Sequence, residues 1–368
     1  MNVAAARAIA ERFALEGKIV SVVPLAGGHI NDSYRVDAQA GDASRAYLLQ
    51  SLNRRVFPRS DLVMENVSRV TRHLSSRLAT AGVADRERRA LTLVPTRRGE
   101  DWHIEADGTC WRVFRFITGT VVLDRARDPQ DAGSAGRAFG GFLRLLADYD
   151  GPPLHETIPA FHDTAARFAR LESAAQTDPY RRAAAARQEI QAVMAQRSLA
   201  AVLPPLVASG EVPRRIVHND TKISNVLLDE RTGEALCVID LDTVMPGSAL
   251  WDFGDMVRSM TSPTAEDEED LTGVGVRVPM FAALARGYLE AAGTLLVPRE
   301  RELLGFAGRL ITLEQAVRFL TDHLEGDRYY RIELAGHNLA RCRTQLALLR
   351  SLTEHAAELD AIVAEQGG

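Results

Sequence analysis

Cysteine is scarce in this sequence, and its three cysteines lie far apart. Cys110, Cys237 and Cys342 form no C-x-x-C pair and show none of the Cys/His spacings typical of a zinc site. An odd number of widely separated cysteines also argues against a disulfide framework. We therefore expect three buried thiols in a protein of a reducing compartment.

Long apolar runs are absent as well. No stretch approaches the roughly 18 uninterrupted apolar residues of a membrane span, and the first residues lack the basic segment and apolar run of a signal peptide. The formal net charge is −5, with arginine and glutamate mixed along the chain, which argues against a nucleic-acid or membrane partner. We expect a soluble cytoplasmic protein, with a monomer favoured.

The length predicts two lobes. A chain of 368 residues exceeds what one ordinary hydrophobic core organises. Apolar strand patterns dominate the first part, and the strand predicted over Trp111–Ile117 ends at Thr118 and Gly119, after which helical patterns follow. We therefore place an N-terminal lobe at residues 1–115, a C-terminal lobe at 116–368 and a hinge at about 114–119.

A stretch in the second half gathers polar side chains at strand ends. Ile216–Val217 is predicted as a short strand before the loop 218–225, and Val226–Leu228 resumes strand character. The segment 229–234 forms a turn with a glycine near its end, and Ala235–Ile239 returns as a strand. Six polar side chains are therefore expected at one end of the sheet: His218, Asp220, Lys222, Asn225, Asp240 and Asp242.

These residue types suit phosphoryl transfer. That reaction needs a carboxylate that accepts the proton of the acceptor hydroxyl, oxygen ligands for Mg²⁺ and a cation near the migrating group. Asp220 suits the base and Lys222 the cation, since residues two apart in an extended loop point to the same side. Asn225 and Asp240 offer the hard oxygen atoms that Mg²⁺ prefers. The spacing H-x-D-x-K-x-x-N matches the catalytic loop of protein kinases and their small-molecule relatives, with His218 as a packed support.

A second motif, Asp252-Phe253-Gly254, spells the D-F-G of the protein-kinase metal site. Asp240 follows directly from an apolar strand, whereas Asp252 begins a helix predicted to run through Met260. We therefore expect Asp252 to hydrogen-bond backbone amides and to brace the catalytic loop. Asp242 is a second metal ligand, a substrate contact or a surface residue.

Glycines near the N-terminus predict a turn over phosphates. Ile19–Pro24 and Ser33–Val36 are expected to be strands, and the turn between them contains Gly27 and Gly28. Paired glycines let the backbone approach a phosphate closely, because no Cβ intervenes and positive φ costs little. An ordinary β-turn has the same sequence signature.

The lysine that protein kinases use against the nucleotide phosphates is missing. In the strand predicted over Ala46–Leu52 the only polar candidate is Gln50. Glu65, on the following helix, would then act without a lysine partner or with Arg54 or Arg55 in its place.

Several segments resemble the N-acetylhexosamine 1-kinases, within the aminoglycoside-phosphotransferase-like group of small-molecule kinases. Together they span about residues 20 to 335, and Gln50 in place of lysine also agrees with that family. The segments are G-G-H-I-N-D-S-Y (27–34), Y-L-L-Q-S-L-N (47–53), V-M-E-N-V (63–67), W-R-V-F-R-F-I (111–117), E-T-I-P-A-F-H (156–162), H-N-D-T-K-I-S-N (218–225), V-I-D-L-D-T-V-M-P (238–246) and R-F-L-T-D-H-L-E-G-D (318–327).

The resemblance implies an α+β, bilobal, protein-kinase-like fold with a small antiparallel-sheet lobe and a larger, mainly helical lobe. It also implies transfer of the ATP γ-phosphate, with Mg²⁺, to the anomeric hydroxyl of an N-acetylhexosamine. The catalytic and metal positions that it implies are Asp220, Lys222, Asn225, Asp240 and Asp242. Those for the nucleotide are Gly27, Gly28, His29, Asn31, Gln50, Phe114 and Phe116, and those for the sugar are Arg318, Tyr329, His29 and Asp240.

Other interpretations remain open at this stage. An arginine such as Arg318 on a helix is often a surface ion-pair partner. The acceptor could be another sugar, an amino alcohol or an aminoglycoside, and a polycationic acceptor would need an acidic pocket, for which Glu266–Asp270 is the candidate. A nucleotide-binding scaffold without catalysis is a more remote alternative.

Overall fold

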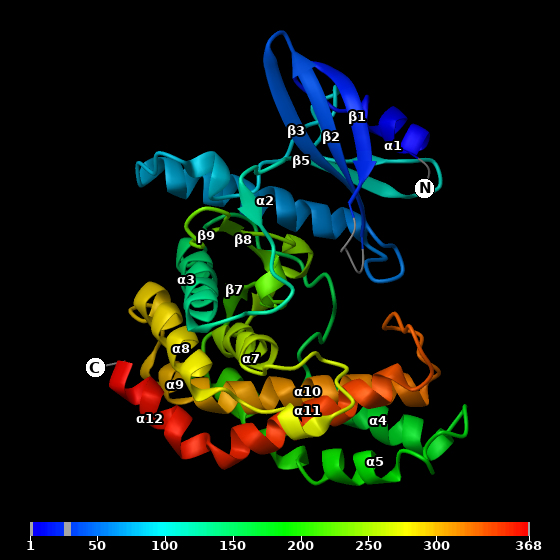
Figure 1. Ribbon diagram of the computed structural model, residues 1–368, viewed down its shortest axis with the longest axis vertical. Coiled ribbons are helices and arrows are strands. Elements are labelled where there is room, and N and C mark those ends of the chain that lie inside the picture. The colour runs from blue at the N-terminus through cyan, green and yellow to red at the C-terminus, as the bar shows by residue number, and fades with distance from the viewer. Residues whose placement is uncertain (1–2, 26–30, 367–368) are drawn as a thin grey trace. The chain divides into compact units, whose positions relative to one another are not determined.

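The computed structural model describes residues 3–25 and 31–366. The chain divides into two compact units. The first contains Met1–Val121, Asp148–Ile158 and Leu227–Met245, and the second contains Val122–Ala147, Pro159–Val226 and Pro246–Gly368. Figure 1 labels the elements along the chain.

An antiparallel sheet forms the centre of the first unit, with strand order β1-β2-β3-β5-β4. Its strands are β1 (Lys18–Pro24), β2 (Asp32–Ala40), β3 (Ala43–Ser51), β4 (His103–Ile104) and β5 (Cys110–Arg115). The strands expected from the apolar patterns before residue 118 are therefore confirmed. The first of them carries a register shift between Ile19 and Ser21.

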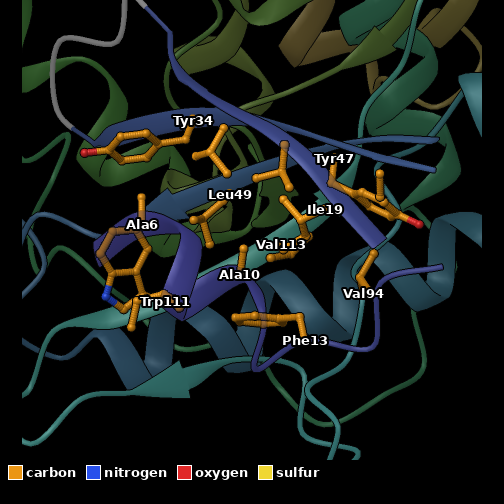
Figure 2. Close-up of a cluster of buried hydrophobic side chains, with 14 residues drawn as sticks. Ala6, Ala10, Phe13, Ile19, Tyr34, Tyr47, Leu49, Val94, Trp111 and Val113 are labelled. Atoms are coloured by element: carbon orange, nitrogen blue, oxygen red, sulfur yellow. The ribbon is translucent and has the colours of Figure 1, made fainter. Parts of the chain in front are cut away.

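Alternation along the strands gives this sheet one apolar face. Successive side chains of a strand point to opposite sides, so the apolar positions of β1, β2, β3 and β5 share one side. The helix α1 (Val3–Ala10) covers that side with Ala6, Ile9 and Ala10, and Phe13 follows it (Figure 2). Tyr47 and Trp111 are buried in the same cluster.

Further elements complete the first unit. The long helix α2 (Ser60–Thr80) is followed by the turn η1 (Arg86–Arg88). A hairpin joins β8 (Val226–Asp229) to β9 (Ala235–Val238), and β8 also pairs with the short strand β6 (Thr120–Val121). The turn η4 (Leu241–Thr243) follows β9 and lies against α2.

The second unit is mainly helical. Helix α3 packs against α8, and α10 packs against α4, α7 and α11 (Figure 1). Its helices are α3 (Pro129–Leu145), α4 (Thr164–Thr177), α5 (Arg187–Met194), α6 (Leu203–Ser209), α7 (Ala249–Met260), α8 (Val278–Ala292), α9 (Pro298–Glu302), α10 (Leu304–Leu324), α11 (His337–Glu354) and α12 (Ala356–Gln366). Shorter elements are η2 (Arg197–Ala201), β7 (Arg215–Val217), η3 (Ile223–Asn225), β10 (Met245–Gly247) and η5 (Leu271–Gly273).

Two glycines set the close packing of α7 against α10. A Cβ on Gly254 would lie 2.4 Å from the Ala307 carbonyl oxygen, and one on Gly308 would lie 2.6 Å from a Val257 methyl group. Real Cβ atoms do not approach other atoms so closely, so any larger residue would push the two helices apart. This packing matters because α7 and α10 both carry side chains of the candidate site.

The expected fold class is confirmed, since an antiparallel sheet forms the N-terminal part and helices form most of the remainder. The three cysteines are buried free thiols, as expected. No single helix within residues 3–25 and 31–366 is long and apolar enough to cross a membrane. Within the same described residues, one pair of helices, 187–194 and 197–209, bent by 41°, has the combined length and apolar composition of a span.

Candidate active site

The loop after β7 is anchored through its backbone to the first turns of α7. The carboxylate of Asp252 accepts hydrogen bonds from the amides of His218 and Asn219, at 2.9 and 2.7 Å. The amide of Thr221 donates to Asp255 at 2.8 Å. The expected bracing role of Asp252 is therefore confirmed. Three amide donors held by two buried carboxylates fix the course of the loop before any ligand binds.

His218 is a packed support, as predicted. It is fully buried, and its ring stands edge-on against Phe139 and Phe142 of α3, with centroids 5.4 and 5.7 Å away. The backbone amide of Asp220 meets its Nδ1 atom at 3.3 Å. The imidazole therefore supports the loop through its packing on α3 and its contact with the Asp220 amide.

Asp220 has one carboxylate oxygen engaged and one available. Lys222 Nζ lies 2.9 Å from Oδ2, and Asn225 Nδ2 donates to the same oxygen at 2.8 Å. Within the described residues no hydrogen bond reaches Oδ1. Burial by itself would raise the pKa of Asp220, but the charge and hydrogen bond of Lys222 outweigh burial and lower the pKa to about 2. An ionised carboxylate with a free oxygen is what a general base requires.

A buried ionic network surrounds Gln50, the strand position at which the sequence lacks a lysine. Arg112, on β5, forms an ion pair with Asp242, and both side chains are 2% exposed. Gln50 Oε1 accepts from Arg112 Nε and Nη2 at 3.2 and 3.1 Å, and Asn31 Nδ2 donates to Asp242 at 2.8 Å. The structure thus brings Asn31, Gln50 and Asp242 together around a guanidinium. The surface interpretation of Asp242 is wrong.

Glu65 has partners other than those considered from the sequence. Its carboxylate lies 2.7 Å from Arg69 and 2.8 Å from His155. Arg54 donates instead to the carbonyl of Asp107. The suggestion that Arg54 serves as the partner of Glu65 is therefore wrong, and Glu65 is held on the side of α2 that faces His155.

Asp240 occupies a strained backbone position directly after β9. Its φ of 60° and ψ of 59° lie in the left-handed region, which costs a residue with a Cβ about 1 kcal/mol or more. Within residues 3–25 and 31–366, no group of three His, Cys, Asp or Glu side chains forms a metal site by itself. A Mg²⁺ ion here would need further oxygen atoms from phosphates and water, which is how Mg²⁺ is usually bound.

The two phenylalanines expected near the hinge each pack against an arginine. The Arg112 guanidinium lies 5.1 Å from the Phe114 ring centroid, and that of Arg35 lies 5.0 Å from Phe116. The backbone amide of Phe116 donates to the Ala46 carbonyl at 3.0 Å. Contact with a nucleotide base remains a prediction for both. Gly27, Gly28 and His29 lie outside the described residues.

Arg318, on α10, is held among aromatic rings. Its guanidinium carbon lies 4.9 Å from the ring centroid of Phe161, 5.8 Å from that of Tyr329 and 5.7 Å from that of Tyr330. Its Nη1 atom donates to Gln315 Oε1 at 3.3 Å, and in the described part of the chain it forms no ion pair. The structure thus brings Arg318 and Tyr329 together. We call this arrangement of Phe161, Tyr329 and Tyr330 around Arg318 the aromatic box.

Comparisons with known proteins agree with the fold. The model of the phosphotransferase enzyme family (APH) matches residues 21–304. The chain belongs to this family. A microcompartment-associated aminopropanol kinase has a similar structure, with 16% identity, a TM-score of 0.59 and coverage of 98% of this chain and 99% of that one. An aminoglycoside phosphotransferase from Alicyclobacillus acidocaldarius gives 12% identity, a TM-score of 0.58 and coverage of 96% of both chains. A choline/ethanolamine kinase family protein from Mesorhizobium loti gives 19% identity, a TM-score of 0.53 and coverage of 98% of both chains.

The acidic run of this phosphotransferase is committed to internal partners. Glu266 contacts Arg258, which is also paired with Asp255 at 2.8 Å. Asp267 lies 2.8 Å from the buried His337, and the Glu268 carbonyl accepts from Thr344. Two carboxylates of this run, Glu266 and Asp267, are therefore paired with side chains of other elements.

Four residues of the candidate site were not identified from the sequence. Arg112 is the one charged residue among the buried positions of β5, which is the signal that could have found it. The others are Asp255, Phe161 and Tyr330. Their contacts with Thr221 and Arg318 join separate segments of the chain, and no local pattern marks them.

Protonation of Asp252 should weaken the loop. Burial raises the pKa of Asp252 to about 6, against the opposing effects of His218 and the amide donors. We expect kcat to rise with pH through about 6, because only the ionised carboxylate offers acceptors to both amides. The free energy of unfolding changes in the opposite direction to kcat. Between about pH 4 and 6 the unfolded chain has lost the proton that folded Asp252 retains, so the free energy of unfolding falls as pH rises.

The measurement is kcat and urea unfolding of the wild type and Asp252→Asn from about pH 4 to about 8. Asp252→Asn should have a lower kcat than the wild type. In this variant neither kcat nor the free energy of unfolding should show the pH dependence described above. A wild-type kcat that is flat across this window, or the same profile in the variant, would contradict the assignment.

Proposed function

We propose that this phosphotransferase moves the γ-phosphate of ATP to the anomeric hydroxyl of an N-acetylhexosamine and releases the sugar 1-phosphate. The observation that carries the choice of acceptor is the aromatic box, with a guanidinium that has no ion-pair partner in the described residues. Aromatic faces pack on the C–H faces of a sugar ring. Guanidinium N–H groups donate to hydroxyl and acetamide oxygens.

A cationic acceptor fits this box poorly. Arg167 Nη2 donates to the Phe161 carbonyl at 3.0 Å, and burial together with the charge of Arg318 lowers the pKa of Arg167. The guanidinium groups of Arg167 and Arg318 therefore both contact Phe161. Like charges repel strongly where water is excluded, so an ammonium group would be disfavoured. The nearby carboxylates of Glu314 and Asp322 are each bonded to other donors. In the acidic run, Glu266 and Asp267 are paired with Arg258 and His337.

In the proposed reaction, Asp220 Oδ1 accepts the proton of the anomeric hydroxyl while Oδ2 stays bonded to Lys222 and Asn225. Lys222 also offers positive charge to the transferred group. The Asn225 amide nitrogen is committed to Asp220, which leaves its oxygen for Mg²⁺, and Asp240 is proposed as the second ligand. Bound Mg²⁺ supplies neutralisation of the phosphate charges. Asp242 is a weaker candidate, because Arg112 and Asn31 engage its carboxylate.

The alternative is a kinase of the same family for an amino alcohol or an aminoglycoside, the acceptor types named for the similar structures. A scaffold without catalysis is less well supported, because Asp220, Lys222 and Asn225 are all in contact.

Phosphorus NMR with ATP, Mg²⁺ and single acceptors tests the proposal. The panel is N-acetylglucosamine, N-acetylgalactosamine, glucosamine, ethanolamine and one aminoglycoside. We expect a new phosphate resonance coupled to an anomeric proton with the N-acetylated sugars. Glucosamine, a matched control that differs by its ammonium group, should react at least about tenfold more slowly, which is the loss of about 1.4 kcal/mol of transition-state stabilisation. Faster transfer to ethanolamine or the aminoglycoside would overturn the proposal.

A further inference from the structure

Helix α10 carries three charged residues in a row along one side. Glu314, Arg318 and Asp322 are spaced by four residues, which places them on the same face of the helix. Arg318 is the centre of the aromatic box, and each carboxylate lies one turn away from it. Both carboxylates are bonded to loops rather than to Arg318.

Glu314 ties down the loop that delivers Phe161. Its carboxylate is bonded to His162 Nδ1 at 2.8 Å and accepts from Thr164 Oγ1 at 2.7 Å. The Glu314 side chain is 2% exposed. Because His162 directly follows Phe161, these bonds fix the ring that covers one side of Arg318.

Asp322 ties down the segment that delivers the two tyrosines. Asp322 Oδ1 accepts from the amides of Arg328 and Tyr329 at 2.9 and 2.8 Å, and Oδ2 accepts from the amide of Tyr330 at 3.0 Å. Asn338 Nδ2 donates to Oδ2 at 2.9 Å. Successive amides of a turn form a concave site for an anion, and charge-assisted bonds are the stronger ones. The segment has no other regular structure to hold it.

The turn before the tyrosines needs such support. Gly326 and Asp327 both have positive φ, at 91° and 57°, and this conformation is unfavourable for Asp327. Asp327 is in turn held by Arg182 and by Asn338 Nδ2, the latter at 2.9 Å. The course of the chain into Tyr329 is therefore imposed by tertiary hydrogen bonds, with Asp322 making the largest number.

We propose that Asp322 is a positioning residue for the acceptor: it holds residues 328–330 so that Tyr329 and Tyr330 close the aromatic box on Arg318. This rests on the proposed function, since the aromatic box is the proposed acceptor site. Asp322 touches neither acceptor nor nucleotide. Its loss should weaken acceptor binding and leave the phosphoryl-transfer groups in place.

Asp322→Asn tests this, because the amide has the same shape but offers an N–H group where an acceptor stood. We expect the KM for the acceptor to rise about tenfold or more, with the KM for ATP and kcat at saturating acceptor within about twofold of wild type. In a Tyr329→Ala background, Asp322→Asn should add much less than it does alone, because it acts largely through the tyrosines. Asp128→Asn, which changes the cap of the distant helix α3, is the matched control and should leave all three constants unchanged.

Hydrogen exchange gives a readout that does not depend on the acceptor. The amides of residues 328–330 should exchange at least about tenfold faster in Asp322→Asn and unchanged in Asp128→Asn. If the wild type does not phosphorylate N-acetylhexosamines, the proposed function fails, while exchange still tests the role of Asp322. Amides that stay protected in Asp322→Asn would overturn the inference. So would faster exchange with an unchanged acceptor KM, or equal losses for both substrates.

If Asp322→Asn does not fold, Asn338→Ala replaces it. That variant keeps the carboxylate and removes one of its donors. We expect the acceptor KM and the amide exchange rates of residues 328–330 each to rise by about threefold. No change in either quantity would overturn the inference.

Discussion

Asp220→Asn is expected to lower kcat by at least about a thousandfold, within the range that general-base residues contribute. The substitution keeps the size of the side chain and removes its capacity to accept the acceptor proton. Lys222 loses its ion-pair partner, but the backbone anchors at Asp252 and Asp255 remain. ATP affinity should therefore stay within about threefold of wild type. Steady-state kinetics and equilibrium binding of a fluorescent ATP analogue measure the two quantities.

The control for Asp220→Asn is again Asp128→Asn, which removes a carboxylate from the same unit without approaching the loop. Turnover by Asp220→Asn at more than about a tenth of the wild-type rate would mean that another group takes the proton. A large loss of ATP affinity would instead assign Asp220 to nucleotide binding.

Arg112→Met is expected to lower the free energy of unfolding by about 3 to 5 kcal/mol, because it leaves the Asp242 carboxylate buried without its cation. Both partners are almost fully inaccessible, so water cannot replace the guanidinium. Gln50 loses its two donors at the same time. Urea unfolding, compared at equal m-values, measures the loss.

Two further variants isolate the ion pair. Arg112→Met with Asp242→Leu removes both charges and should recover most of the lost stability, since apolar replacement of a buried pair is often neutral or better. Arg115→Met, on the same strand, removes an exposed arginine paired with Glu16 and should cost less than about 1 kcal/mol. A double variant no more stable than Arg112→Met would show that the network, rather than the unpaired charge, sets the loss.

Local patterns in the sequence predict much of this fold. The apolar alternation of β2 and β3 and the strand pattern of β5 each have a physical cause in side-chain burial, and the structure contains all three strands. The spacing from His218 to Asn225 predicts that Lys222 points to the same side as Asp220, and the two side chains are in contact. These residues lie within one short loop, although Asp252 and Asp255 of α7 hold its backbone.

Contacts between distant residues could not be predicted in this way. Arg112 and Asp242 are 130 residues apart, and nothing in the composition around either marks the other as its partner. The run Glu266–Asp270 resembles a cation-binding patch in the sequence, because Arg258 and His337, the partners of Glu266 and Asp267, lie on other elements. Asp322 presents the same difficulty, since its four donors come from a turn and from α11. In each case the partner comes from a distant part of the sequence. Only the three-dimensional arrangement therefore distinguishes a side chain with an internal structural partner from one that binds a ligand.

The contact between Lys222 and Asp220 also has a chemical consequence. Lys222 and Lys18 are the only lysines in the sequence, and arginine supplies every other strongly basic side chain. Guanidinium groups resist acylating reagents under conditions in which amines react, because they keep their protons. An activated ester therefore has two lysine side chains to modify, one exposed on β1 and one bonded to the proposed base. Mass spectrometry can therefore measure the extent of labelling at Lys222 relative to that at Lys18. A ligand bound at the proposed base should lower this ratio, so occupancy can be followed in the unmutated protein.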